Sequence, residues 1–412
     1  MMSCMTIGLL VPVTVVRAAG HGIEITSPSN NSVVTNVFRT AMNSGETKYL
    51  TFAYRIENYD GYYYAYKVLL DGKPQDDLVN TSFNENTKIV EKSYILDGQM
   101  FLNAHGQGVH TFTVIAYHRK LISDLSPGLS PGPGSQYSYT TDSCSVSFTF
   151  DPIVVHFIGF WYTESNGNEW KDSILPFYDL LRSSRAHYLL GYHYLTGSWD
   201  DDKPGEVFKD ALAPLENSND IDIVVFYSHG VSSCILGHYL ECPEGFAADG
   251  CLTRNELKRA FLNAQLDSST ILLIIDCCNS GMFTDSFKDT NIIVLTSSKD
   301  GEPSSYIGDS YYSSSWSMEK KLYEMDSLFL HSLVQGLYYQ GSLSKVFNHI
   351  AYWSFYDDDF TPGIQHKNYD YPRNPDSHGN KLSPFDQQQH PDETNLDRIA
   401  DTSLIFYDNS VV

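Results

Sequence analysis

Residues 271–283 of this chain read ILLIIDCCNSGMF, and residues 221–230 read IDIVVFYSHG. Each stretch is an unbroken apolar run of strand length that stops at a polar, reactive side chain. Such runs are typical of parallel strands that are buried on both faces. In an open α/β sheet the reacting groups gather just beyond the carboxyl ends of the strands. If the two strands are neighbours, His229 and Cys278 share one crevice, which is the arrangement of a cysteine nucleophile and its histidine partner.

A glycine accompanies each reactive side chain. Gly230 directly follows His229, and Gly281 comes shortly after Cys278. Glycine lets the backbone approach a bound substrate closely. We therefore expect the backbone N–H groups of Gly230 and Cys278 to donate hydrogen bonds to the oxyanion that forms when a thiolate attacks a carbonyl group.

The charge balance of the chain excludes several classes of partner. Its 27 Lys and Arg residues stand against 50 Asp and Glu residues, which gives a formal net charge of −23. A negative potential of this size repels nucleic-acid phosphates and anionic bilayer surfaces. We therefore expect no nucleic-acid partner. We also expect no membrane span once the leader is removed, because no later stretch approaches the roughly 20 apolar residues of such a helix.

The first residues of the chain have the pattern of a leader. Residues 7–16 are apolar, and small residues suited to a signal peptidase follow at 18–20, although no Lys or Arg precedes the apolar stretch. The pattern predicts a signal peptide over residues 1–20 and a secreted or cell-surface protein. In an oxidising compartment one disulfide is expected among Cys234, Cys242 and Cys251, with its connectivity left open.

The next part of the chain has the pattern of a β-sandwich. Residues 22–150 contain short alternating runs separated by turn clusters such as Asp71-Gly72-Lys73-Pro74. Runs at this spacing predict an antiparallel sandwich. Residues 108–114 and 145–148 resemble in texture the last two strands of immunoglobulin-like modules, which implies an all-β immunoglobulin-like module over residues 21–151. Exposed tyrosines on it, among the 29 of the chain, are candidates for cell-surface or glycan contacts.

From residue 152 onward, apolar strands alternate with helices. This order predicts a mainly parallel α/β sheet with helices on both faces. Thr253 and Glu256 form the capping-box pattern of a helix over residues 252–262. The polar region from about residue 357 lacks periodicity and is expected to be irregular, with residues 402–407 as a candidate edge strand. The expected strands and remaining helices lie at 153–160, 172–183, 188–195, 207–216, 221–227, 270–276, 292–296 and 327–339.

Three motifs of this second part resemble those of the caspase-like cysteine peptidases, and the legumain family is the most similar. Residues 227–230, YSHG, are similar to the His-Gly motif of that family, and residues 276–283, DCCNSGMF, to its acidic-x-Cys-x-Ser-Gly motif, which metacaspases share. Residues 296–316 resemble the segments that line the pocket for the residue before the scissile bond. The resemblance covers residues 153–337 and implies a caspase-like peptidase domain over residues 152–412.

The resemblance also implies roles for individual residues. Only Cys278 has the family's spacing to the Ser-Gly pair, so it is the expected nucleophile, with His229 as its partner and Cys277 as a buried neighbour. This chemistry needs no cofactor. The residues expected to contact a peptide or protein substrate are Asn166, Asp276, Ser304, Ser305 and Asp309.

The specificity is expected to differ from that of legumain. The Arg and His that the family uses to recognise asparagine are replaced here by Asn168 and Glu169. A pocket with Asp276 and Asp309 but no balancing arginine is negative, which predicts cleavage after Arg or Lys. Two alternatives stay open: cleavage after Asn or Asp, and a non-catalytic cell-surface binding protein with a degenerate peptidase domain.

A metal site is the rival interpretation of the residues around His229. They lack the paired Cys-x-x-Cys of structural zinc sites, so no metal is predicted. The set comprises His229, Cys234, His238, Cys242 and Cys251.

Overall fold

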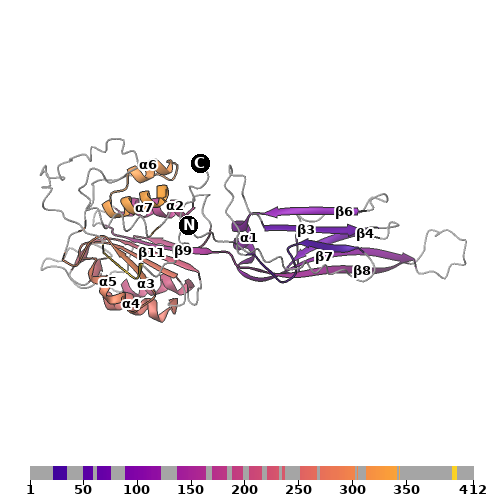
Figure 1. Cartoon of the computed structure of the whole chain (residues 1–412), viewed down its shortest axis with the longest axis horizontal. Helices are drawn as coiled ribbons and strands as arrows, with labels where there is room; N and C mark the ends of the chain where they lie inside the picture. The colour runs from indigo at the N-terminus through magenta and orange to yellow at the C-terminus, as the bar shows by residue number, and fades with distance from the viewer. Residues whose placement is uncertain are drawn as a thin grey trace, which may run out of the picture. The chain divides into compact units, whose positions relative to one another are not determined.

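The computed structural model describes most of the regular elements of the chain. The described residues are 22–34, 50–58, 63–75, 89–121, 137–163, 169–182, 188–197, 204–215, 220–231, 234–236, 251–266, 270–301, 304, 312–340, 343 and 392–396. The expected signal peptide and the candidate edge strand at 402–407 lie outside these residues. Within them, contacts divide the chain into two compact units between Pro152 and Ile153, and Figure 1 labels several elements of each.

The N-terminal unit contains a three-stranded and a five-stranded sheet. Their orders are β1-β3-β6 and β2-β8-β7-β4-β5, and all described pairs are antiparallel except β2 with β8. Alternate residues of β3 are buried, as expected for strands with one covered face. The strands are β1 (Ile23–Ser27), β2 (Ser32–Val34), β3 (Leu50–Glu57), β4 (Tyr63–Leu70), β5 (Lys73–Pro74), β6 (Ile89–Leu96), β7 (Gly108–Leu121) and β8 (Tyr137–Phe150).

Aromatic side chains from both sheets form the core of this unit. The ring centroid of Phe52 lies 4.8 Å from that of Phe112 and 5.7 Å from that of Phe148. Each of these three side chains is at most 1% exposed. Because the first belongs to the small sheet and the other two to the large sheet, their contact joins the two sheets.

The unit is not all-β, because it also contains helix α1 (Gly98–His105). Asp97 caps this helix by accepting hydrogen bonds from the N–H groups of Gln99 and Met100, and Phe101 is buried. The expectation of an all-β module missed α1, because eight residues between two strands give too short a pattern. The immunoglobulin-like character of the unit stays a prediction.

Tyrosines also gather on the outer side of the larger sheet. The ring centroid of Tyr64 lies 6.3 Å from that of Tyr117 and 6.2 Å from that of Tyr139, which is 67% exposed. Tyr64 stands at a register shift between β4 and β7, where an extra residue turns its side chain outward. The expectation that exposed tyrosines bind glycans or protein stays a prediction.

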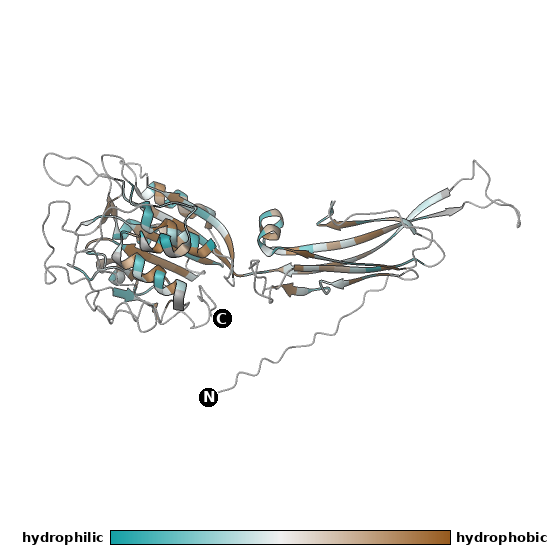
Figure 2. Ribbon diagram, turned by 90° about the horizontal axis from the view of Figure 1, so that it is seen from above, coloured by the Kyte–Doolittle hydropathy of each residue, from teal (hydrophilic) through white to brown (hydrophobic). Residues whose placement is uncertain are grey.

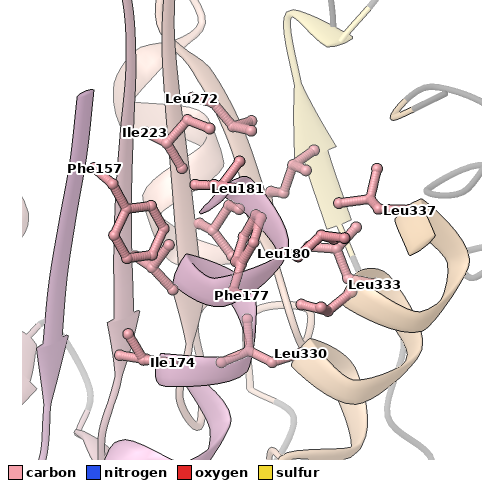
Figure 3. Packing of buried hydrophobic residues seen from close by; sticks show 14 of the residues in the cluster. Phe157, Ile174, Phe177, Leu180, Leu181, Ile223, Leu272, Leu330, Leu333 and Leu337 are labelled. Carbon is pink, nitrogen blue, oxygen red and sulfur yellow. The ribbon is translucent and has the colours of Figure 1, made fainter. Parts of the chain in front are cut away.

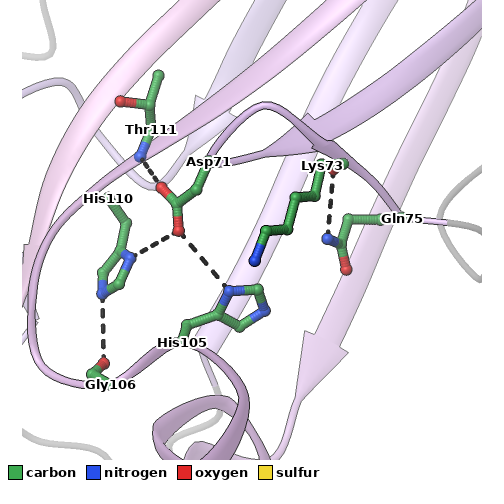
Figure 4. Close-up of polar contacts among 7 residues, drawn as sticks. All are labelled: Asp71, Lys73, Gln75, His105, Gly106, His110 and Thr111. Carbon is green, nitrogen blue, oxygen red and sulfur yellow. Dashed lines mark hydrogen bonds and ion pairs between the residues drawn. The ribbon is translucent and has the colours of Figure 1, made fainter.

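A polar cluster ties the β4–β5 turn to α1 and β7 (Figure 4). Asp71 accepts a hydrogen bond from the Thr111 N–H at 2.8 Å, and its other carboxylate oxygen lies 2.9 Å from His110 Nδ1 and 3.7 Å from His105 Nδ1. Burial alone would raise the pKa of Asp71, but the hydrogen bonds from Thr111 and His110 and the nearby imidazoles lower it below its ordinary value. The charged carboxylate therefore stabilises this turn.

Replacing Asp71 with asparagine should lower the free energy of unfolding of the N-terminal unit by about 1 kcal/mol at pH 7. Asparagine tolerates the left-handed backbone at this position, where φ is 52°, so the variant loses the charge and one of the two acceptor oxygens but keeps the turn. Because the folded pKa of Asp71 is lowered, the contribution is present above the pKa of the unfolded chain. It disappears as the pH falls through the folded value, where variant and parent should converge.

Urea unfolding followed by far-UV circular dichroism and tyrosine fluorescence measures this effect. All five tryptophans lie at residue 161 or later, so tryptophan fluorescence reports on the C-terminal unit and serves as the internal control. Equal stability of Asp71→Asn and the parent at pH 7 would contradict the assigned role.

The C-terminal unit is built on a six-stranded sheet with the order β10-β9-β11-β15-β16-β17. The first five strands are parallel to one another, and β17 is antiparallel to β16. This confirms the expected mainly parallel α/β sheet. The strands are β9 (Val154–Trp161), β10 (Leu189–Thr196), β11 (Ile221–Tyr227), β15 (Thr270–Asp276), β16 (Ile293–Thr296) and β17 (Asp392–Thr394).

Strand β17 lies in the region that was expected to be irregular. Its sequence, Asp-Glu-Thr, has no apolar pattern, so nothing local predicts a strand there. The side chain of Asn395, the next residue but one after Glu393, donates hydrogen bonds to the carbonyl groups of Phe287, Thr290 and Ile292. The segment is therefore anchored by contacts with residues about a hundred positions earlier in the chain.

Helices cover both faces of the sheet (Figure 1). One face carries α2, α6 and α7, and the other carries α3, α4 and α5. In Figure 2 the strands are mostly brown, whereas the helices carry both brown and teal residues, as expected for elements with one buried face. The helices are α2 (Leu175–Arg182), α3 (Pro204–Leu212), α4 (Arg254–Asn263), α5 (Met282–Phe287), α6 (Met318–Tyr323) and α7 (Leu328–Gln340), with short 3-10 turns at Lys171–Ser173 and Ala213–Leu215.

The alternation of side chains along β11 shows why both faces need cover. Ile223 and Val225 join the cluster with Phe177 and Leu333 from the helices of one face, drawn in part in Figure 3. Val224 and Phe226 belong to the cluster on the other face. A strand that is buried on both sides has no polar face, which explains its continuous apolar sequence.

The N-terminus of α4 matches its sequence pattern. The Thr253 side chain accepts from the Glu256 N–H, and the Glu256 side chain accepts from the Thr253 N–H, which confirms the expected capping box. Among the helices that the structure describes, none is long and apolar enough to cross a bilayer.

Candidate active site

The two apolar strands of the sequence analysis are neighbours in the sheet. Strands β11 and β15 pair in parallel over their whole length, from Ile221 opposite Thr270 to Tyr227 opposite Asp276. The Ser228 N–H continues the pairing by donating to the Asp276 carbonyl oxygen at 3.0 Å. Both strands thus end at the same level, and the chain segments that follow them emerge side by side.

The backbone at Gly230 packs directly against Cys278. A Cβ atom built at Gly230 would lie 2.0 Å from the Cys278 carbonyl oxygen and 2.8 Å from Cys277 Sγ. Real Cβ atoms do not approach other atoms this closely, so only glycine fits here. The segment that carries His229 is therefore pressed against the segment that carries Cys278.

A small three-stranded sheet holds Gly230 in this place. Strands β12 (Gly230–Val231), β13 (Cys234–Leu236) and β14 (Cys251–Thr253) are paired antiparallel in that order. A disulfide between Cys234 and Cys251 links β13 to β14, and the Leu236 N–H donates to the His229 carbonyl oxygen at 3.0 Å. This disulfide supplies the connectivity that the sequence left open among the three cysteines. Cys242 lies outside the described residues.

The two adjacent cysteines have opposite surroundings. Cys277 is 1% exposed, and burial, followed by the nearby Asp276 and Cys278, raises the pKa of its thiol well above the ordinary value. Cys278 is half-buried and free, and the Ser304 N–H donates to its sulfur at 3.4 Å. Because the thiolate is the nucleophilic form of cysteine, Cys278 is the better placed of the two for attack.

The residues after Cys278 form the turn into α5. Ser280 is fully buried, and its hydroxyl accepts a hydrogen bond from the Ser298 N–H at 3.1 Å. A Cβ atom on Gly281 would lie 2.5 Å from the Asp300 nitrogen. The Ser-Gly pair of the motif thus binds the turn to the end of β16, where a larger residue would not fit.

Two aromatic rings flank His229, which is exposed. The centroid of its imidazole lies 4.6 Å from the ring centroid of Tyr162 and 4.6 Å from that of Trp170, both in edge-on geometry. Such contacts restrict the rotation of the imidazole. The sequence analysis did not single out either aromatic residue, because they come from the segments around β9 and only the sheet order brings them to His229.

Asp276 has no exposed surface, whereas we expected it to line the substrate pocket. It accepts a hydrogen bond from Ser304 Oγ at 2.6 Å and another from Ser327 Oγ. Burial raises the pKa of Asp276, and hydroxyl donors, Ser304 first, oppose the shift. The physical reason for its position is strand alternation: Asp276 has the same parity as Leu272 and Ile274, which face the α2 and α7 layer.

A second buried carboxylate lies close to the first. Ser173 Oγ donates to Asp326 Oδ1 and accepts from the N–H groups of Asp326 and Ser327 at 3.1 and 2.8 Å. Burial raises the pKa of Asp326 to about 7, and the nearby acidic residues add to the rise. The start of α7 is therefore attached both to the 3-10 turn after Trp170 and to Asp276.

Contacts join four of the expected site residues, Gly230, Asp276, Cys278 and Ser304, and His229 is the residue before Gly230. Asn166, Ser305 and Asp309 lie outside the described residues. No group of His, Cys, Asp and Glu side chains within the described part of the chain could hold a metal ion. Two members of the rival zinc set, Cys234 and Cys251, are joined in the disulfide instead.

Comparison with known proteins shows a slight likeness in structure but none in sequence. No family model and no curated protein matches the chain. Among solved structures it is similar to the crystal structure of caspase-1 from Spodoptera frugiperda, with 13% sequence identity and a TM-score of 0.34 over 63% of this chain and 91% of that one. A likeness at this identity and TM-score does not indicate a function.

Replacing Gly230 with alanine should push the segment that carries His229 away from the segment that carries Cys278. The added methyl group overlaps the Cys278 carbonyl, so the backbone must shift, and the free energy of unfolding should fall by roughly 2 kcal/mol. The rate at which iodoacetamide alkylates Cys278 should differ from that of the parent as well. Urea unfolding followed by tryptophan fluorescence, and mass spectrometry of the alkylated peptide, measure the two effects.

Gly205→Ala is the matched control. Gly205 lies in α3, and a Cβ atom there meets nothing within 4 Å, so this variant should be as stable as the parent or slightly more stable. Equal stabilities of Gly230→Ala and Gly205→Ala would show that the close approach to Cys278 is not needed.

Proposed function

We propose that this protein is a cysteine peptidase of caspase-like fold, in which Cys278 is the nucleophile and His229 transfers protons. One observation carries the proposal: the in-register pairing of β11 with β15, which delivers Gly230 onto the Cys278 backbone. Two motifs that lie far apart in the sequence thereby meet at the carboxyl ends of these strands. In α/β proteins the reacting groups lie at this end of the sheet.

The reaction follows the chemistry of a thiol nucleophile. The Cys278 thiolate attacks the carbonyl carbon of the peptide bond, an S–C bond forms, and the carbonyl oxygen becomes an oxyanion. The N–H groups of Gly230 and Cys278 stabilise this oxyanion. Collapse of the intermediate breaks the C–N bond, and the His229 imidazolium gives its proton to the leaving amine.

Water completes the cycle. His229, now neutral, takes a proton from a water molecule, whose oxygen attacks the thioester. The S–C bond breaks, which releases the carboxylic acid product and restores the Cys278 thiolate. No cofactor takes part in any of these steps.

Export is also proposed. The Cys234–Cys251 disulfide supports it, because such bonds persist in oxidising compartments and are rare in the cytosol. The bond lies beside the segment that carries His229 and Gly230, so a reducing compartment would loosen the proposed site. Detection of the processed protein in the culture medium of the producing cells tests export, and retention of an uncleaved chain in the cytosol would contradict it.

Labelling with an acyloxymethyl-ketone peptide should modify Cys278 alone. Cys278→Ala should abolish both labelling and peptide hydrolysis, whereas Cys277→Ala should keep both. His229→Ala should lower kcat by about 10²- to 10⁴-fold, the usual contribution of a proton-transferring group. Mass spectrometry of the labelled peptide and a fluorogenic assay measure these outcomes. A binding protein with a degenerate peptidase domain would instead show no specific labelling in any variant.

The preferred cleavage site is proposed to follow Arg or Lys. The net charge of −23 supports a cationic substrate, but burial of Asp276 leaves Asp309 as the acidic residue expected from the sequence to meet the substrate side chain. A peptide library should give kcat/KM values at least about tenfold higher for Arg and Lys than for Asn and Asp. The reverse preference would favour cleavage of the legumain type.

A further inference from the structure

Ser304 connects the sulfur of Cys278 to the buried carboxylate of Asp276. Its backbone N–H donates to Cys278 Sγ at 3.4 Å, while its own hydroxyl donates to Asp276 Oδ1 at 2.6 Å. Ser297 Oγ also donates to Ser304 Oγ at 3.1 Å. Because two partners hold the hydroxyl of Ser304, the direction of its N–H depends on them.

Asp276 is in turn fixed by the beginning of α7. Ser327 is the residue before this helix, and its hydroxyl accepts the Leu330 N–H at 2.8 Å while it donates to Asp276 Oδ2. The positive end of the helix dipole therefore lies near the carboxylate, where it stabilises negative charge. The side chains of both Asp276 and Ser327 are completely buried.

A hydrogen bond directed at sulfur favours the charged form of a thiol. An N–H group donates more strongly to a thiolate than to a neutral thiol, so it stabilises the nucleophilic form of cysteine. The carboxylate has the opposite direct effect, because negative charge near Cys278 disfavours a second negative charge. Asp276 can therefore favour the thiolate only by way of the residue that it holds.

We propose that Asp276 and Ser327 are positioning residues that hold Ser304 so that its N–H stabilises the Cys278 thiolate, and that Asp276 does not itself contact the substrate side chain. This inference rests on the proposed function in taking Cys278 as the nucleophile. Asp276, the acidic residue of the motif, thus supports the site by holding Ser304 in place. Substrate recognition then belongs to other residues.

The rate of iodoacetamide alkylation of Cys278 as a function of pH tests the proposal. Ser304→Ala leaves the charge of the site unchanged but removes the hydroxyl, so the midpoint of the alkylation profile should rise by about one pH unit. Ser304→Thr keeps the hydroxyl and should restore the parent profile. In a peptide assay, Ser304→Ala should lower kcat about tenfold and change KM little.

Ser327 provides a second and independent test. Ser327→Gly removes the hydroxyl that binds Asp276, yet glycine is tolerated at a helix N-cap at a cost of only a few tenths of a kcal/mol, so the variant should fold. Its alkylation midpoint should rise in the same direction. Ser332→Ala changes a buried serine inside α7 that is not part of this hydrogen-bond network, and it should leave the profile unchanged.

Asp276→Asn separates positioning from substrate recognition. If Asp276 contacts the substrate, this variant should raise KM for Arg and Lys peptides selectively, while the Ser304 and Ser327 variants keep the parent alkylation profile. That pattern would overturn the proposal. Asp222→Asn is the matched control. Asp222 is an equally buried aspartate in the neighbouring strand β11, and it lies near the strand end that is far from Asp276.

The outcomes also distinguish this inference from the proposed function. Alkylation of Cys278 needs no peptide substrate. A shifted alkylation profile without peptide hydrolysis would uphold the positioning role and reject the peptidase. Efficient hydrolysis with unshifted profiles in Ser304→Ala and Ser327→Gly would uphold the peptidase and reject the positioning role.

Discussion

The parallel, in-register pairing of β11 with β15 organises the C-terminal unit. The two strands begin and end opposite one another, so the residues that follow them leave the sheet at one level. Each strand is buried on both faces, and a slip by one residue would move every side chain to the other face. The hydrophobic core therefore sets the register, and the register determines which polar residues meet beyond it.

The same alternation explains why two adjacent cysteines differ so strongly. Cys277 belongs to the cluster on the side of α3, α4 and α5, together with Ile275, and burial keeps its thiol protonated. Cys278 follows in the turn, half-buried, where a backbone N–H reaches its sulfur. One step along the chain thus separates a core residue from a reactive one. The close approach of Gly230 then fixes the distance between the two strand ends without any side chain in between.

Polar side chains beneath the site are satisfied by hydroxyl groups and not by opposite charges. Asp276 and Asp326 are both buried, and serine side chains donate to each of them. Burial raises the pKa of both carboxyl groups, and the serine donors limit the rise. An ion pair at this depth would need two desolvated charges, whereas serine adds little volume and no charge. The serine-rich segments around residues 297–304 and 327 thus have a structural reason that composition alone does not reveal.

The α/β class of the C-terminal unit, its two buried strands and the capping box of α4 could be predicted from local sequence patterns, because hydrophobic periodicity and capping are local properties. The sequence also indicated His229 and Cys278 as candidates, since each ends an apolar run. Four features could not be predicted in this way: Asp276 is buried beneath α7, Tyr162 and Trp170 flank His229, Cys234 pairs with Cys251, and a polar segment near residue 393 completes the sheet. Each of these depends on contacts between residues far apart in the chain, whose energies arise only when the core has brought the elements together.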